Sequence, residues 1–326
     1  MDASQRAGAS VRQRAGEYTH LRAQLRDGLD VLASALEVRE PALLGDYARW
    51  SGRVALARND PFNNPVAFFK GLRDAVHIPA GAQAVLVDQF LRDAEMWSLT
   101  GAFEEDRSVA SNSNARRFLD LLLNYDTQNA GRVVDDAVAG GFSMAQVHQE
   151  ILEPSLVETG LRWERAQLPV AQEHYVSDAV REVMTTLVRS SPRLEPRKRT
   201  FIAMCAEGER HDLGLRMLHD QLTVRGWQTI WLGADVPNLG LLTVVRINAP
   251  AVLGLSVSMT TNLRHVPEAI ASMRLMDERV RVIVGGKPFR AVADLWERVG
   301  ADAVAQDAVS GTAIAERLGD DLALSA

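Results

Sequence analysis

The chain has 326 residues, of which 47% are hydrophobic and 24% are charged, and these proportions are ordinary for a globular protein of two or three domains. The formal net charge of −6 argues against broad nucleic-acid binding, and the single cysteine excludes an internal disulfide and a multi-cysteine zinc site. There is no apolar run long enough to span a membrane and no apolar signal-peptide core near the start, so we expect a cytoplasmic protein with neither a membrane nor a nucleic-acid partner.

Residues 1–105 are predicted to form an N-terminal all-α domain. Leucines recur at steps of three and four between Leu21 and Leu36, and Pro41 suits the first turn of a second helix. After a polar start at 1–15 that we expect to be disordered, the pattern predicts helices near 17–36, 41–54, 68–76 and 81–97, with a turn-rich break at 59–65.

Large apolar and aromatic side chains are concentrated in this domain, although aromatic residues make up only 6% of the chain. The simpler interpretation is that they fill the core of a small helical domain. The alternative is a pocket for a flat conjugated ligand, which would stack on aromatic rings. The side chains concerned are Tyr18, Tyr47, Trp50, Phe62, Phe68, Phe69, Phe90, Met96 and Trp97.

Residues 115–190 follow a polar linker at 104–114 and are predicted to form an antiparallel four-helix bundle, because their helical segments are joined by short connections. Ser143 and Gln146 predict a capping box at the start of the third helix. The expected helices are 116–125, 130–139, 143–160 and 170–189, and the basic, proline-containing segment 191–199 is expected to be the next linker.

Residues 199–326 alternate between apolar strands and helices, a pattern that predicts a Rossmann-like, doubly wound parallel sheet. The expected strands are 200–206, 228–233, 252–257, 280–284 and 303–305. The expected helices are 212–225, 239–247, 263–277, 289–299 and 312–318.

The loop after the first of these strands carries the motif Glu209-Arg210-His211-Asp212-Leu213-Gly214. Ligands of such sheets bind at this carboxyl edge, and a neutral imidazole there can ligate a transition metal. Glu209 is placed to accept the other ring N–H, and Gly214 lets a bulky group approach the backbone. Taken alone, the motif is more often a solvated histidine loop than a metal site.

Two later strands end in small residues, Gly254-Leu255-Ser256-Val257-Ser258 and Val284-Gly285-Gly286, which leave a slot beside the sheet. The three motifs in this order resemble the cobalamin-binding domain, although Ser258 stands where that family usually has leucine. The resemblance implies His211 as the lower cobalt ligand, Glu209 as its partner and a slot for the cofactor tail. The implied binding set around them is Arg210, Asp212, Leu213, Gly214, Asp235, Val236, Ser256, Val257, Ser258, Gly285 and Gly286.

A second motif lies in the predicted bundle, where Trp163 precedes Glu173-His174 and Val170 begins the last helix. Without the downstream domain it would be a core tryptophan beside a helix-start acid. With it, the segment resembles the upper cap of CarH-type adenosylcobalamin photoreceptors. That resemblance implies that Trp163 and Val170 pack around the adenosyl group, that Glu173 hydrogen-bonds it and that His174 belongs to the same wall.

The chain departs from that family in two places. Many members have a histidine after the tryptophan that binds cobalt once adenosyl has left, but here the residue is Glu164, so His148, His174 or solvent would take that role. The N-terminal domain is helical and lacks a MerR-like DNA-binding domain. It is similar in this respect to photocobilins, which bind biliverdin near the corrin, and since Cys205 is badly placed for a thioether link, a bilin would bind non-covalently.

These observations predict a cobalamin-dependent light sensor rather than an enzyme. Light would cleave the cobalt–carbon bond of adenosylcobalamin, and the bundle would then move relative to residues 199–326. We expect light-dependent self-association to carry the signal to a downstream partner of unknown identity. The alternative is a corrinoid protein that carries methyl groups for a partner methyltransferase, and a mutase is disfavoured because no substrate barrel fits in the chain.

Overall fold

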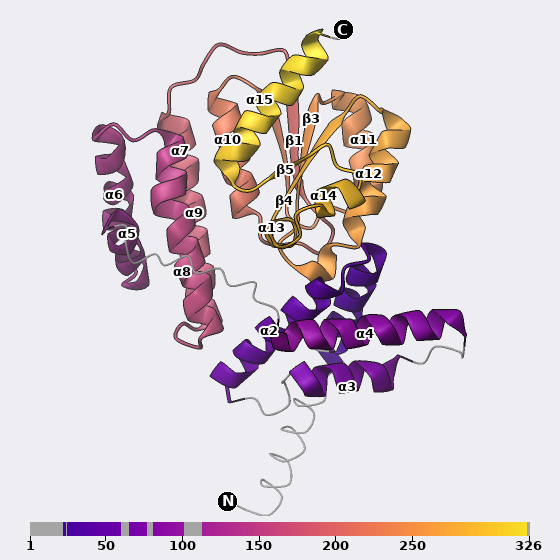
Figure 1. Ribbon diagram of the computed structural model, residues 1–326. Helices are drawn as coiled ribbons and strands as arrows, with labels where there is room; N and C mark the ends of the chain where they lie inside the picture. The colour runs from indigo at the N-terminus through magenta and orange to yellow at the C-terminus, as the bar shows by residue number, and fades with distance from the viewer. Residues whose placement is uncertain (1–21, 24, 60–64, 77–80, 101–112, 325–326) are drawn as a thin grey trace, which may run out of the picture.

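The computed structural model describes residues 22–23, 25–59, 65–76, 81–100 and 113–324. In Figure 1 a helical bundle and an α/β domain stand side by side, and the N-terminal helices lie below both. The polar start 1–15, Leu21, Tyr18, Phe62 and most of the linker 104–114 fall outside the described residues. No helix in the described ranges is long and apolar enough to cross a membrane.

The C-terminal part is a parallel sheet with helices on both faces, which confirms the predicted Rossmann-like fold (Figure 1). The strand order β2-β1-β3-β4-β5 reverses between β1 and β3, so a crevice opens at the carboxyl ends of these two strands. The strands are β1 (Thr200–Cys205), β2 (Gln228–Gly233), β3 (Val252–Ser256), β4 (Arg281–Gly285) and β5 (Ala303–Ala305).

Strand β1 is apolar throughout because both of its faces are covered. Phe201, Ala203 and Cys205 belong to the core formed with α10 and α15, whereas Ile202 and Met204 belong to the core on the opposite face. The Cys205 thiol is fully buried, and burial raises its pKa well above the ordinary value. Cys205 is therefore a core residue, as the sequence predicted.

The helices of this domain agree with the prediction except near its end. The expected helix 289–299 is wrong, because Val292 adopts an extended conformation and is largely buried, which divides the segment into two short helices. The expected helix 312–318 is longer than predicted. The helices are α10 (Leu213–Val224), α11 (Asn238–Asn248), η3 (Thr260–Asn262), α12 (His265–Met276), α13 (Lys287–Ala291), α14 (Leu295–Arg298) and α15 (Ala308–Leu324).

The helical bundle lies against α10. The predicted capping box is confirmed, since Ser143 and Gln146 each accept a hydrogen bond from the other's backbone N–H. The long third helix contains a π turn just before Pro154, a residue that has no N–H to continue the regular ladder. The elements are α5 (Ser113–Leu123), α6 (Thr127–Ala139), α7 (Met144–Val147), η2 (His148–Leu152), α8 (Glu153–Glu164) and α9 (Val170–Ser190).

The described residues of the N-terminal part form helices with short turns at their ends, with helical residues at 25–37 followed by α2 (Pro41–Ala57), α3 (Pro65–Ala75) and α4 (Ala82–Thr100). Helices α2 and α4 pack closely at Gly45, where a Cβ would lie 2.7 Å from the carbonyl oxygen of Ala94. Phe69 is fully buried, whereas Met96 is 60% exposed. The core interpretation therefore holds for Phe69 and for Tyr47, Phe68 and Phe90, which are partly exposed but pack against the shared core. Trp50 and Trp97 are also partly exposed and are not part of that core cluster.

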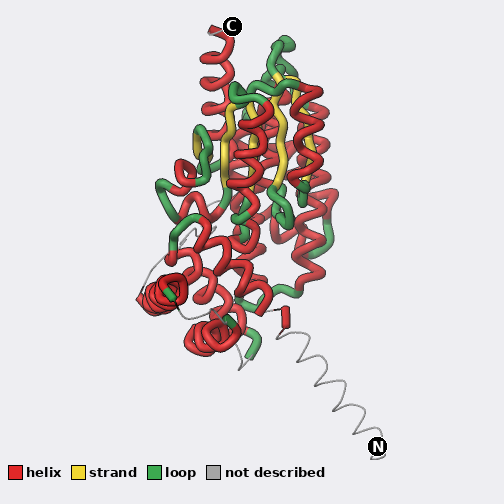
Figure 2. Tube along the Cα trace, turned by 90° about the vertical axis from the view of Figure 1, so that its right-hand side faces the viewer, coloured by secondary structure: helices red, strands yellow, loops and turns green. Residues whose placement is uncertain are grey.

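The N-terminal helices share one continuous apolar core with the α/β domain, from Val31 and Leu44 on one side to Val266 and Leu295 on the other. Figure 2 shows the same stacking from the side. Ion pairs border this core, among them Arg264 with Asp30 at 2.5 Å, Arg298 with Glu40 at 3.2 Å and Lys287 with Asp46 at 3.5 Å. The N-terminal helices are thus attached to the α/β domain by a common hydrophobic surface.

Candidate cofactor-binding site

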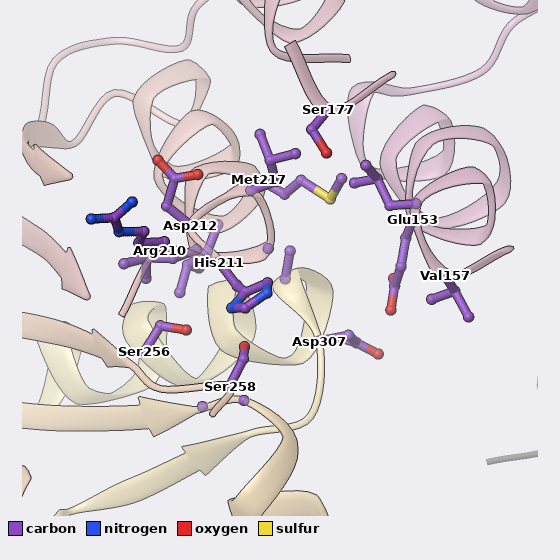
Figure 3. Close-up of a pocket in the computed structure, with 18 of the residues that line it drawn as sticks. Glu153, Val157, Ser177, Arg210, His211, Asp212, Met217, Ser256, Ser258 and Asp307 are labelled. Atoms are coloured by element: carbon purple, nitrogen blue, oxygen red, sulfur yellow. The ribbon is translucent and has the colours of Figure 1, made fainter. Parts of the chain in front are cut away.

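A cavity of about 850 Å³ lies between the α/β domain and helices α8 and α9 of the bundle. Its floor is the crevice at the carboxyl ends of β1, β3 and β4, where an open parallel sheet binds ligands. In Figure 3 the His211 ring projects into this space above Ser256 and Ser258, with Glu153 and Val157 of the bundle on the far side. The volume falls in the upper part of the range of small-molecule pockets and fits a large ligand.

His211 is held in one orientation by Glu209. Its ring Nδ1 lies 2.6 Å from Oε1 of Glu209, and its side chain is 64% exposed. The hydrogen bond to Glu209 raises the pKa of His211, against the opposing effect of burial. Because Nδ1 is engaged, Nε2 is the nitrogen left for a ligand in the cavity.

The Glu209 carboxylate is fully buried and organises the whole floor. It accepts hydrogen bonds from the backbone N–H groups of His211 at 2.9 Å, and of Ser258 and Met259 at 2.8 Å each. Asn262 Nδ2 donates a further bond at 3.3 Å. Burial alone would raise the pKa of Glu209, but the hydrogen bonds from His211 and Met259 outweigh it and lower the pKa to about 2. Glu209 is therefore ionised at neutral pH and ties the β1–α10 loop to the end of β3.

Small residues at the ends of β3 and β4 line the floor, as the sequence predicted, but Gly286 among them is tightly packed against the protein itself. Gly286 has φ +113°, and a Cβ there would lie 1.8 Å from the carbonyl oxygen of Val257, so no other residue fits. Gly160 and Gly214, one on each side of the cavity, differ, since a Cβ at either would meet no atom within 4 Å. A ligand can therefore approach the backbone at both positions.

Helices α8 and α9 each present one face to the cavity. Glu173 is held by its own helix, with Oε1 accepting a hydrogen bond from Ser177 Oγ at 2.9 Å and Oε2 lying 2.6 Å from His174 Nδ1. The lining residues recur at helical steps of three and four. They are Glu153, Leu156, Val157, Gly160 and Trp163 on α8, and Val170, Glu173, His174, Ser177, Asp178 and Arg181 on α9.

Sequence reasoning missed most of these helix-face residues. It identified Trp163, Val170, Glu173 and His174 from a local motif and did not extend the helical period from them. Counting back from Trp163 in steps of three and four would have found the α8 face. The residues missed include Glu153, Leu156, Val157, Gly160, Ser177, Asp178, Arg181, Arg290 and Asp307.

Arg181 of the missed set joins the bundle to the α/β domain. Its guanidinium donates two hydrogen bonds to the Asp212 carboxylate, from Nη1 at 3.0 Å and from Nη2 at 2.8 Å. Asp212 follows His211 directly and precedes α10, so this bidentate pair connects α9 to the loop that carries the candidate metal ligand.

Most sequence-predicted site residues line the cavity, but Glu209, Val257, Asp235 and Val236 do not. Glu209 lies behind His211, and the Val257 side chain points into the hydrophobic core with no exposure. Asp235 instead accepts a hydrogen bond from the Gly208 N–H at 2.7 Å, and the Val236 N–H bonds Cys205. Val257, Asp235 and Val236, which the sequence predicted to be in the binding set, therefore lie outside the cavity lining.

Of the three residues that the sequence analysis considered for the side of the cofactor opposite His211, one lines the cavity and two do not. His174 lines the cavity and is 72% exposed. His148 is 1% exposed and lies between the bundle and α10, where Gln221 Nε2 donates to its Nδ1 at 3.3 Å. Glu164 is not a lining residue, and its carboxylate pairs with Arg53 of α2 at 2.7 Å. Of the two histidines considered for the upper side, the cavity thus contains His174 and not His148.

The potential metal-binding side chains at the cavity fit a metal ion that is already coordinated by a macrocycle. Among the residues that the structure describes, no group of three or more His, Cys, Asp or Glu side chains is placed to hold a bare metal ion. A single oriented imidazole facing a large open space is the arrangement that an equatorially ligated metal macrocycle requires, as haem proteins illustrate. His211 with Glu209 behind it meets that requirement.

Comparison with known proteins also indicates a metal macrocycle as the ligand of this site. Residues 199–314 match the family model of the B12 binding domain, and residues 115–187 match a second B12 binding domain model. The chain therefore carries cobalamin-binding domains over its bundle and its α/β domain, and its cofactor class is a corrinoid.

Similar proteins fall into two functional groups. The chain is 30% identical over 176 residues to the HTH-type transcriptional repressor CarH of Myxococcus xanthus, an alignment that covers 54% of this chain and 58%, less than two thirds, of the repressor. It is 24% identical over 198 residues to trimethylamine corrinoid protein 1 of Methanosarcina acetivorans, covering 58% of this chain and 89% of that protein. The monomethylamine corrinoid protein of Methanosarcina barkeri has the same fold, with a TM-score of 0.55, 24% identity and coverage of 62% of this chain and 96% of that structure.

Proposed function

We propose that this protein is a cobalamin-dependent light sensor that binds adenosylcobalamin between the bundle and the α/β domain. The observation that carries the proposal is the set of Trp163, Val170 and Glu173, which lines the cavity from helices α8 and α9 of the bundle, while His211 lines it from the α/β domain. When bound, adenosylcobalamin would supply a cobalt–carbon bond that light can break. The similarity to CarH supports the same class of function.

Each residue of the site then has a defined role. His211 binds the metal through Nε2, and Glu209 fixes the ring orientation from below. Trp163 offers an aromatic surface on which a purine can pack, and Glu173 offers carboxylate oxygens to sugar hydroxyls. Ser177 and His174 hold the Glu173 carboxylate in place before the ligand arrives.

Signalling would follow from the two-layer construction of the site. An upper group bound in the cavity would lie between the bundle and the α/β domain, so its loss would remove packing between these two parts. The ion pair of Arg181 with Asp212 is then a main polar contact across the cavity. We propose that the resulting movement of the bundle changes self-association and is read by a downstream partner.

The alternative is a corrinoid protein that carries methyl groups for a partner methyltransferase, as the similarity to trimethylamine corrinoid protein 1 suggests. A methyl group is small and needs no aromatic and carboxylate wall above the metal. The Trp163, Val170 and Glu173 wall therefore favours the larger adenosyl group.

Two measurements separate these functions. The absorption spectrum of the full-length protein loaded with adenosylcobalamin should change under green light. Trp163→Ala should weaken adenosylcobalamin more than methylcobalamin, whereas His211→Ala should weaken both and alter the corrin spectrum. Light insensitivity, together with equal losses for both cobalamins in Trp163→Ala, would favour the methyl carrier.

We further propose a non-covalent biliverdin site in the N-terminal domain. The observation in its favour is a set of partly exposed rings in mutual contact, with Tyr47 5.7 Å from Trp50 and 5.9 Å from Phe68 between centroids. Biliverdin added to the cobalamin-loaded protein should give a red absorption band that denaturation releases. The absence of a band at saturating biliverdin would mean that these rings serve only in packing.

A further inference from the structure

Helix α2 lies across the lower side of the molecule and contacts both layers that enclose the cavity (Figure 1). At its N-terminal end, Glu40 and Asp46 pair with Arg298 and Lys287 of the α/β domain. At its C-terminal end it contacts the end of α8 in the bundle. The helix has 17 residues and is about 26 Å long, enough to bridge the two layers.

The contact with the bundle is centred on Trp163. The Trp50 ring stacks on the Trp163 ring with 6.4 Å between centroids and 26° between planes. The Arg58 guanidinium lies 4.6 Å from the Trp163 ring centroid and donates a hydrogen bond to the Trp163 carbonyl oxygen at 2.8 Å. Trp163 is therefore in contact with α2 while it also lines the cavity.

The same contact fixes the end of α8. Arg58 Nη1 donates to the Glu164 carbonyl oxygen at 3.2 Å, and Arg53 Nε donates to the Glu164 carboxylate at 2.7 Å. Carbonyls of the last helical turn have no partner within the helix, and a cation there is favoured by the helix dipole. Arg58 therefore adds a donor and a positive charge at the C-terminal end of α8, where the Trp163 carbonyl also accepts from the Ala166 N–H, and Arg53 holds the Glu164 side chain on the side of α2.

We propose that Trp50, Arg53 and Arg58 are positioning residues for the upper face of the cofactor site, acting through Trp163 and Glu164. The N-terminal domain thereby sets how well Trp163 packs on an upper group, and it responds when that group leaves. The inference rests on the proposed function, because it assumes that Trp163 forms the adenosyl wall. It adds a role for three residues that lie outside the two matched B12-binding segments.

The test is the ratio of the Kd values for adenosylcobalamin and methylcobalamin, measured on the full-length protein in the dark. Trp50→Ala should weaken adenosylcobalamin about threefold to tenfold, the range expected for one lost aromatic pair, with little change for methylcobalamin. Trp50→Phe keeps a ring against Trp163 and should restore most of the ratio. Leu56→Ala is the matched control, since Leu56 lies on the same helix and is 79% exposed.

Arg58→Gln provides a second variant if Trp50→Ala does not fold, because Arg58 lies at the exposed end of α2. It should lower the same ratio, since the cation over the Trp163 ring is lost. Equal effects on both cobalamins, or a ratio no different from Leu56→Ala, would overturn the inference if Trp163→Ala still weakens adenosylcobalamin more than methylcobalamin. If Trp163→Ala itself binds both cobalamins with unchanged preference, the proposed function fails and the inference fails with it.

Discussion

Single residues in this site divide into those that shape the protein and those that leave room for a ligand. Glu209 belongs to the first kind, because its carboxylate satisfies backbone N–H groups of Ser258 and Met259 in addition to orienting His211. The sequence predicted only the contact with His211. Glu209→Ala should consequently cost folding stability as well as cofactor affinity, since a buried N–H without a partner costs about 1–3 kcal/mol.

Gly214 and Gly286 allow these two roles to be measured separately. Gly286→Ala should destabilise the protein without cofactor by more than about 1–3 kcal/mol, because its backbone conformation is strained for alanine and a Cβ would collide with the Val257 carbonyl. Gly214→Ala should leave stability unchanged or raise it by up to about 1 kcal/mol, since the space around it is open and alanine favours a helix.

Cobalamin binding should be weakened by both substitutions, because a methyl group at Gly214 enters the space left for the ligand. Urea unfolding of the cofactor-free proteins and cobalamin titration check the pair. Unimpaired cobalamin binding by Gly214→Ala would show that the ligand does not approach the backbone there.

His148 should make folding stability depend on pH. Burial lowers its pKa from 6.5 to about 4, although the nearby Asp220 carboxylate acts in the opposite direction. Its hydrogen-bond partner is neutral, since Gln221 donates to His148 Nδ1 and in turn accepts a hydrogen bond from Thr312. In the unfolded chain His148 therefore becomes protonated below about pH 6.5, whereas in the folded chain it stays neutral down to about pH 4.

The free energy of unfolding should thus fall as the pH is lowered from about 6.5 to about 4, by about 3 kcal/mol at most from this residue. His148→Asn keeps an acceptor for Gln221 and removes the titration. The difference in unfolding free energy between the two proteins, measured by urea denaturation across this range, isolates His148 from other groups. A difference independent of pH would contradict the prediction.

At the scale of helices and loops, the site is assembled where α9 meets the start of α10. Arg181 and Asp212 are 31 positions apart in the chain and make the bidentate contact between them. Asp212 is 9% exposed at its side chain and Arg181 is 40% exposed, so the pair is partly screened by solvent.

A double-mutant cycle with Arg181→Gln and Asp212→Asn should give a coupling energy of about 1 kcal/mol in unfolding of the cofactor-free protein. Arg162→Gln is a suitable control, since Arg162 pairs with Glu158 of the same helix, α8, at 2.7 Å. A coupling energy indistinguishable from zero would mean that this ion pair does not help to hold the bundle to the α/β domain.

At the scale of the whole molecule, α2 is attached to the α/β domain by a continuous core and to the bundle by a smaller, partly exposed contact. The smaller contact should yield first when the layers separate. Illumination of the adenosylcobalamin-loaded protein should therefore increase hydrogen exchange near the C-terminal end of α2 and at the end of α8.

The buried strand β1 provides the internal control for that measurement, because it lies in the core of the α/β domain and should not change. Hydrogen exchange with mass spectrometry, in the dark and after green light, checks the prediction. Equal hydrogen exchange of α2 in the dark and after green light would show that the N-terminal domain takes no part in a light-driven change.

The sequence by itself determined the local elements and the lower half of the site. Apolar runs bounded by small residues mark strands buried on both faces, and Ser143 with Gln146 marks a helix start, because such signals act between neighbours in the chain. For the same reason the Glu209–Gly214 loop could be placed at the carboxyl edge of the sheet before any tertiary contact was known. The break at Val292 escaped this reasoning, since burial of one side chain overrode a helical pattern.

The tertiary structure alone decided which distant surfaces meet. Glu164 and Arg53 are 111 positions apart, and nothing in the pattern around either residue predicts that they pair. His148 could have faced the cavity or the core, and its burial depends on how the bundle rests on α10. Such contacts arise from the packing of whole faces, so their choice depends on the shape of every side chain in the interface and not on the local period.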